Sequence, residues 1–257
     1  MSSPTVETAA VPAAPAPAPA PPAPLASRIV DVFFSPAKAF EQLREGKAPW
    51  LGPVLVCIAL ALLVIAVRPL FISDQKMAEA GLEQMRQMGV QQLPSVDELA
   101  AKMTQQTILG AVGATVWMFL RVGLVGLILF GVYGLALGGR NDLRPYMAVT
   151  SHAFLVPTVG FLLVAALQYA TGRLDITMDA ALLAPGLDSG GVLARVLHGI
   201  TPWGVWLVAL LALGGATINR RKGWIGVAVL LFALQMAMVT GFAMLTHLAA
   251  GRAAAAG

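Results

Sequence analysis

One unbroken apolar stretch, residues 108–137, limits what this chain can fold into more than any other feature. It is thirty residues long and holds a single ionisable side chain, Arg121. A helix needs about 20 apolar residues to cross a hydrocarbon core of about 30 Å, so this stretch crosses with a tilt or with an extra turn outside. It is also rich in glycine, and small residues let helices approach closely in lipid. The stretch therefore predicts the central helix of a packed transmembrane bundle.

The composition and four further apolar stretches point to the same class of protein. The chain is 58% hydrophobic and 12% charged, whereas a soluble domain averages about 25% charged residues. We therefore expect an all-α fold, a polytopic membrane bundle of five helices that fills residues 28–250, with a short outer tail at residues 251–257. The predicted spans are residues 50–68, 108–138, 146–169, 202–218 and 223–249.

The basic residues indicate the orientation of these spans. The net charge is +4, but Lys and Arg gather at the ends of apolar stretches, so we expect no nucleic-acid partner. The flank before the first span and the turns 140–144 and 219–222 hold four, two and three of them. The longer inserts 72–106 and 170–200 hold three and two. The positive-inside rule then places the N-terminus in the cytoplasm, and five spans place the C-terminus outside.

The segments before the first span have a different composition. Residues 1–27 are rich in Pro and Ala, which predicts a disordered cytoplasmic tail; a partner-docking arm is the alternative. In the segment that follows, Ser35 and Pro36 have the character of a helix start. Apolar residues flanked by basic ones then predict an amphipathic helix at the membrane interface. A plug that packs under the bundle is a second interpretation, and the two are compatible.

The two inserts predict short helices outside the membrane. In the first, Ser95 followed by Glu98 forms a capping box, so a helix should begin near Val96. The methionines before it favour amphipathic helices on the outer face over a metal-binding box. In the second insert, residues 192–197 predict a short surface helix.

Two polar residues within spans are candidates for function. Arg121 lies at the outer interface if its span starts near Met118, where its stem can snorkel to water; a deeper position would need an interior partner. His152 is a hydrogen-bonded packing residue in one interpretation and a proton relay in the other. The chain shows no zinc, phosphate-binding or nucleophile-elbow motif. We therefore expect no catalytic residue, no metal and no cofactor.

Glycine spacing supplies a packing hypothesis. Gly134 and Gly138 form a GxxxG step at the end of the long stretch, and such steps bring helices into close contact. We expect this face to contact another helix.

Four short motifs resemble the Ypt-interacting protein (Yip) domain family. Residues 35–40 resemble its SPxxAF entry, and residues 50–53, which include Gly52 and Pro53, resemble the tail of its DLxGP signature. Residues 152–157, which end at Pro157, lie where the family has a Gly-Tyr pair followed by proline. Residues 203–214 with the basic turn and last span resemble its closing hairpin. This chain lacks the Asp of the signature and the Gly-Tyr pair.

The resemblance implies five spans, a cytoplasmic N-terminus and no enzymatic activity. Eukaryotic members bind Rab-type GTPases, but the Ala/Gly/Arg-rich usage indicates a bacterial source and hence the inner membrane. We therefore expect an adaptor or membrane organiser that binds lipids or unidentified membrane or cytoplasmic proteins, with a homo-oligomer left open. The alternative is a small permease or channel that uses Arg121 and His152; an intramembrane enzyme is disfavoured because its motifs are absent.

Overall fold

The computed structural model describes residues 24–45, 49–87, 90, 92–184, 186–187 and 191–255, and within these ranges the regular elements are all helical. The all-α class is thus confirmed. Most of the predicted N-terminal tail, residues 1–23, lies outside the described part of the chain. The elements are α1 (Leu25–Phe34), α2 (Pro36–Glu45), α3 (Leu51–Val67), η1 (Arg68–Leu70), α4 (Asp74–Gln87), α5 (Val96–Ala101), α6 (Met103–Phe130), η2 (Gly131–Ala136), α7 (Leu143–Ala153), α8 (Leu155–Thr171), η3 (Ala180–Leu183), α9 (Val192–His198), α10 (Pro202–Ile218) and α11 (Ile225–Ala255).

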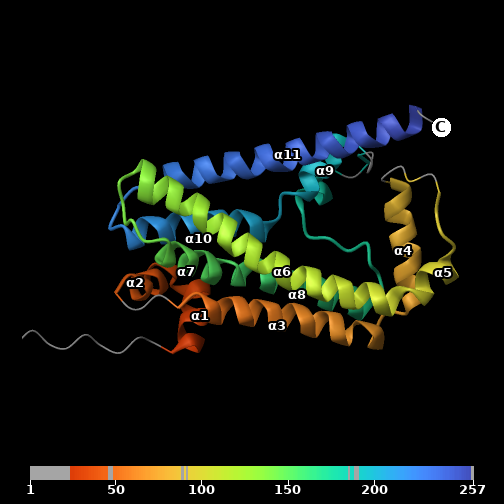
Figure 1. Cartoon of the computed structure of the whole chain (residues 1–257), viewed down its shortest axis with the longest axis horizontal. Helices are drawn as coiled ribbons and strands as arrows, with labels where there is room; N and C mark the ends of the chain where they lie inside the picture. The colour runs from red at the N-terminus through yellow and green to blue at the C-terminus, as the bar shows by residue number, and fades with distance from the viewer. Residues whose placement is uncertain are drawn as a thin grey trace, which may run out of the picture.

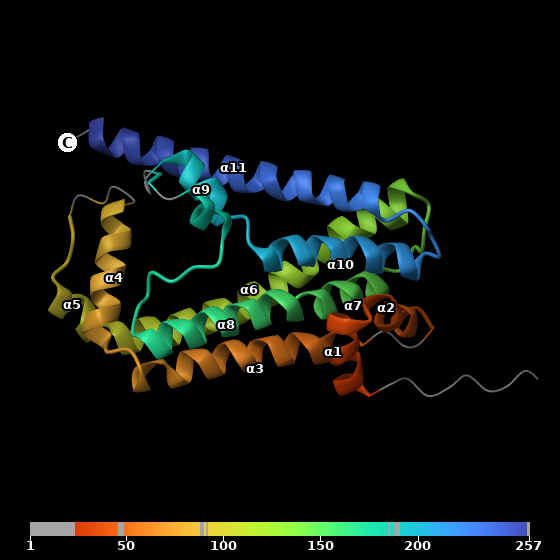
Figure 2. The same ribbon diagram turned by 180° about the vertical axis from the view of Figure 1, so that it is seen from behind.

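Most of the long helices follow one axis, so the molecule has two ends of different character (Figures 1 and 2). At one end lie α4, α5 and the C-terminal part of α11. Toward the other end lie α1, α2 and two turns, one between η2 and α7 and one between α10 and α11. We call this the basic end, because its two turns, residues 137–142 and 219–224, carry Arg140, Arg220, Arg221 and Lys222.

Four helical stretches are long and apolar enough to cross a membrane. They are Leu51–Leu70, Gln105–Ala136, Leu143–Thr171 and Ile225–Leu245. The α10 helix has 17 residues and counts as a fifth crossing only together with α9, to which it is bent by 59°. The helices extend beyond two of the predicted spans: the third crossing stretch begins at Leu143 rather than at residue 146, and α11 continues as helix to Ala255.

The position of α10 favours five crossings over four. Its C-terminal end lies at the basic end, where the Asn219 side chain accepts a hydrogen bond from the Arg140 backbone. Its first turn lies beside the middle of α8, where the Trp203 ring fills the space in front of Gly160. The chain therefore enters α10 beside α8, after α9 and a bend of 59°, and returns along the bundle to the basic end.

Reporter fusions distinguish these two topologies. We expect a reporter after Asn141 to be active in the cytoplasm, and reporters after Leu187 and Ala255 to be active outside. The fusion at Ala255 is decisive, because a bundle in which α9 and α10 only dip into the membrane would return the C-terminus to the cytoplasm. A cytoplasmic signal at Ala255 would therefore reject the fifth crossing.

The third crossing is interrupted at Phe154, between α7 and α8. Pro157 explains the interruption, because proline has no N–H for the carbonyl four residues earlier and its ring crowds that carbonyl. Phe154 is 2% exposed and packs with Val54, Cys57, Val122 and Leu155. The break therefore places an aromatic ring in the contact between α3, α6 and α8.

The segment before the first span forms two helices rather than one. Val32 of α1 and Phe40 and Leu43 of α2 are buried in the main core, and α2 packs against α10 and α7. Phe34, at the end of α1, is 84% exposed. The segment is therefore packed against the bundle, as the plug interpretation expects, while its outer face keeps an apolar side chain free for the membrane.

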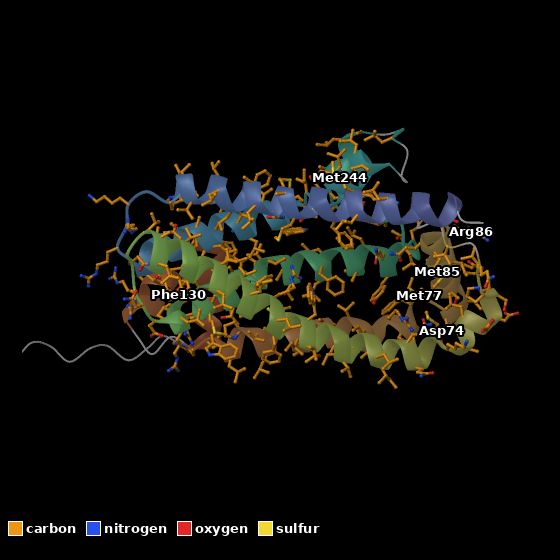
Figure 3. All side chains as sticks on the ribbon, turned by 45° about the horizontal axis from the view of Figure 1, so that its top comes forward. Asp74, Met77, Met85, Arg86, Phe130 and Met244 are labelled. Atoms are coloured by element: carbon orange, nitrogen blue, oxygen red, sulfur yellow. The ribbon has the colours of Figure 1, made fainter. Side chains whose placement is uncertain are left out.

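The first insert folds into a helical hairpin at the end opposite the basic end. The Arg68 guanidinium binds the Asp74 carboxylate at 3.0 Å and ties the start of α4 to η1. Figure 3 shows Met77 and Met85 on α4, with Phe130 far away toward the basic end. The α4 and α5 helices share a small hydrophobic core that is separate from the main core, and Met85 packs against it. Met85 therefore serves helix packing within the hairpin.

Two local predictions for the inserts are confirmed. The Ser95 hydroxyl accepts a hydrogen bond from the Glu98 backbone at 3.2 Å and caps α5, which begins at Val96. In the second insert α9 covers Val192–His198, and the His198 ring binds the Asp179 carboxylate at 2.9 Å. The start of α5 is thus set by a local capping signal, whereas α9 begins without a side-chain cap and leads into α10.

The two glycines of the predicted GxxxG step do not form a shared helix-packing face. A Cβ added at Gly134 would lie 2.8 Å from the Phe130 ring and 2.9 Å from the Arg140 carbonyl oxygen, both in its own helix and turn. Gly138 has a φ of +64° and open space around it. The reason is that the helix changes to π geometry at Gly131 and ends before Gly138, so the regular step of four residues is lost.

Close helix contacts occur instead at a pair of glycines in α10. A Cβ at Gly214 would overlap the side chain of Val149, and one at Gly215 would overlap the ring of Tyr133. Tyr133 is fully buried, and its hydroxyl donates to the Ala212 carbonyl at 2.6 Å. These two glycines therefore let α10 approach η2 and α7.

Candidate functional site

The C-terminus of α10 holds an arginine in a conformation that favours glycine. Arg220 has a φ of +55° and is the sole non-glycine residue with positive φ in the described ranges. Its backbone N–H donates to the Thr217 carbonyl at 3.1 Å, and the N–H of Arg221 donates to the Ala216 carbonyl at 2.9 Å. This is a Schellman cap, in which the left-handed position is usually glycine. The left-handed conformation costs an L-residue about 1–2 kcal/mol, and strained residues of this kind cluster at functional sites.

Asn219 joins the two turns of the basic end. Its Oδ1 accepts from the Arg140 backbone at 2.8 Å and lies 3.1 Å from the Tyr146 hydroxyl, while its Nδ2 donates to the Gly215 carbonyl at 2.7 Å. A Cβ at Gly139 would overlap the Asn219 side chain, so glycine leaves the room that this contact needs. The turns are thereby fixed to each other rather than free.

A second bond strengthens this connection. The Arg221 guanidinium donates to the Leu137 carbonyl across the two turns. Arg140 in turn donates from Nη1 to the Arg44 carbonyl at 3.5 Å, a long contact that joins the end of α2 to the same unit. Three segments that are distant in the sequence are thus held side by side.

These segments enclose a pocket of about 460 Å³. We call it the arginine pocket; its described lining residues are Arg44, Gly138, Gly139, Arg140, Ile218, Asn219 and Arg220. No acidic side chain occurs among them, so the pocket has a positive potential. Guanidinium groups and amides offer hydrogen-bond donors, and this chemistry suits recognition of an anionic group rather than proton transfer.

Arg121 is half-buried and lies against an aromatic ring of the bundle. Its guanidinium carbon lies 4.9 Å from the centre of the Phe154 ring, a cation–π contact with a buried residue. The α6 helix begins at Met103 and the candidate span at Gln105, not near Met118, so this helix does not meet the condition for an outer-interface position.

The packing of α3 against α6 gives the level of Arg121. A small cavity between these helices is lined by Ile58, Ala61, Leu62, Ala114, Thr115 and Met118. Val54 and Val122 then share one core cluster, so the helices are antiparallel and Arg121 lies level with Leu55. Leu55 is four residues from the start of α3, or about 6 Å. Arg121 therefore lies toward the end of the bundle where α1 packs, and far from the end that holds the first insert.

Cysteine labelling tests this level. In a Cys57→Ser background, we expect the Arg121→Cys variant to resist a membrane-impermeant maleimide added from outside, because the position lies level with the start of α3, the end that we expect to face the cytoplasm. Gln105→Cys is the matched control, since that exposed position starts the same span at the insert end. Labelling at 121 as fast as at 105 would restore the outer-interface placement.

His152 is buried and makes a bond within its own helix. Its Nδ1 lies 2.7 Å from the Ala148 carbonyl, while its Nε2 is buried without a partner. No hydrogen bond joins His152 to Arg121 within the described residues. The unpartnered Nε2 of His152 is the one feature that favours the permease alternative. Against it, the two candidate residues, His152 and Arg121, do not contact each other through a hydrogen bond.

Two motif residues at the start of α3 serve the docking of α1. A Cβ at Gly52 would lie 3.2 Å from Leu25, so glycine at this position lets α1 approach, and Pro53 occupies the buried first turn of α3. Arg28 of α1 is 7% exposed, its Nε has no partner, and burial lowers its pKa. The N-terminal helices are thus part of the folded unit.

The comparison with protein families agrees with this arrangement. The model of the Yip1 domain matches residues 30–243, from α1 into α11. The chain belongs to the Yip1 domain family. It is an integral membrane protein, as the apolar helices also indicate. Among curated proteins and among solved structures, none matches the chain significantly.

The arginine pocket of this Yip1 domain was not among the predicted sites. In the sequence, Arg140 and Arg220 belong to the basic turns and Arg44 to the flank before the first span, and these segments indicate only orientation. One signal was available, because an arginine directly after Asn219 occupies the place where a helix usually ends in glycine. The pairing of this turn with the turn that contains Arg140 has no local signal.

Proposed function

We propose that this Yip1 domain is a non-enzymatic membrane organiser, and that the arginine pocket is where it binds partner proteins or lipids. The observation that carries the proposal is the convergence of Arg44, Arg140 and Arg220 on one pocket, held in place by Asn219. A rigid cluster of donors at a membrane surface recognises anionic groups with little ordering cost. Family membership supports the proposal, since Yip proteins are membrane proteins that interact with proteins and lipids.

Affinity purification tests the proposal. The full chain and an Arg140→Gln/Arg220→Gly double variant are purified from native membranes in mild detergent, and mass spectrometry identifies the co-purifying proteins and lipids. We expect at least one species bound by the wild type to be lost from the double variant. Arg173→Gln is the control, because this exposed arginine lies at the opposite end beside Asp175. Identical profiles for the wild type and the double variant would contradict the proposal.

A further inference from the structure

The conformation of Arg220 is one that the helix cap itself does not require of an arginine. A Schellman cap is satisfied by glycine at the left-handed position, which glycine adopts without strain. This chain has arginine there, at a φ of +55°, beside a turn whose own left-handed residue is Gly138. Arg220 lines the pocket together with Arg44 and Arg140. Because folding alone does not need an arginine here, we infer that the charge of Arg220 serves to contact a ligand.

The surroundings of the pocket indicate that this ligand is amphiphilic. Leu135 and Leu137, directly before Gly138, are 66% and 37% exposed, and Ile225 at the start of α11 is 66% exposed. Apolar side chains thus flank the arginines at the end of a membrane bundle. A molecule with an anionic head and acyl chains matches both features, with the head in the pocket and a chain along the apolar surface. Basic pockets at the ends of membrane helices bind lipid headgroups in this manner.

We propose that the arginine pocket binds the phosphate of an anionic phospholipid, with Arg220 as the residue that discriminates it from neutral lipids. The inference rests on the proposed function and names the ligand class of the same site. Arg140 and Arg220 come from the two separate turns, so an occupied pocket also holds these turns together. The bound lipid is then expected to stabilise the whole basic end.

The Arg220→Gly variant separates binding from folding. Glycine relieves the left-handed strain, so the variant should melt at the same temperature as the wild type or higher. The same change removes a guanidinium whose charged hydrogen bond contributes about tenfold in affinity. Lys222→Gln removes a neighbouring exposed charge that does not line the pocket, and is the matched control.

The experiment titrates the delipidated full chain in detergent with phosphatidylglycerol, phosphatidylcholine or inorganic phosphate. Native mass spectrometry counts bound lipid, and thermal melting reports stabilisation. We expect the wild type to prefer phosphatidylglycerol, the Arg220→Gly variant to lose about tenfold in that preference, and the Lys222→Gln variant to keep it. We expect inorganic phosphate to compete only weakly, because it lacks acyl chains.

Three results would overturn the inference: no preference for phosphatidylglycerol, an equal loss in the two variants, or strong binding of inorganic phosphate that displaces the lipid. The first two show at most a general surface charge, and the third shows a soluble phosphate as the ligand. None of these results contradicts the proposed function. The proposed function would still hold if the affinity purification found a protein partner that binds the wild type but not the Arg140→Gln/Arg220→Gly double variant.

Discussion

The Gly215→Leu variant is expected to lose the packing of α10 against η2 and to unfold at a markedly lower temperature than the wild type. A side chain at this position enters the space of the Tyr133 ring. That ring is fully buried, and its hydroxyl is fixed to the Ala212 carbonyl at 2.6 Å, so it has no room to move aside. Overpacking and the lost hydrogen bond together should cost about 3 kcal/mol or more.

Gly123→Leu is the control for this experiment. Gly123 lies within α6, two turns before its end, and an added Cβ there would meet no atom within 4 Å. Leucine is a better helix former than glycine by about 1 kcal/mol, so this variant should melt at the wild-type temperature or slightly above. Both variants are measured by thermal unfolding in mild detergent. Equal melting temperatures for the two variants would show that α10 does not approach Tyr133 as described.

The contrast between these glycines shows what the sequence could predict about the fold and what it could not. Hydropathy located the long helices, because an apolar run of sufficient length has few other stable conformations in a membrane. The GxxxG spacing of Gly134 and Gly138 did not identify a packing face. Spacing assumes a regular helix, whereas this segment becomes π-helical at Gly131. Gly215 has no such spacing to mark it, and its role depends on a partner far away in the sequence.

The arginine pocket shows the same limit for function. Arg140 and Asn219 are 79 residues apart, and Arg140 and Arg44 are 96 apart. The distribution of Lys and Arg predicted that all three segments lie on one side of the membrane. The positive-inside rule does not predict which of these segments contact each other. Which turns lie side by side is decided by the packing of α2, α7 and α10, and that follows from side-chain shape in the core rather than from local pattern.

Asn219→Ala is expected to loosen the basic end while leaving the rest of the bundle folded. Alanine removes the acceptor for the Arg140 backbone and the Tyr146 hydroxyl, and the donor to the Gly215 carbonyl. Each bond is worth about 0.5–1.5 kcal/mol, and Asn219 is only half-buried, so we expect a loss of about 2 kcal/mol. Hydrogen exchange should then increase in the turns 137–142 and 219–224, with little change in α4 and α5.

Two further variants show that the effect depends on the hydrogen bonds of Asn219. Asn141→Ala changes an exposed asparagine in the neighbouring turn and should leave both melting and exchange as in the wild type. Asn219→Asp keeps an acceptor for Arg140 and Tyr146 but loses the donor to Gly215, and should therefore fall between the wild type and Asn219→Ala. If Asn219→Ala and Asn141→Ala exchange alike, the two turns are not held together by Asn219, and the arginine pocket loses its rigid frame.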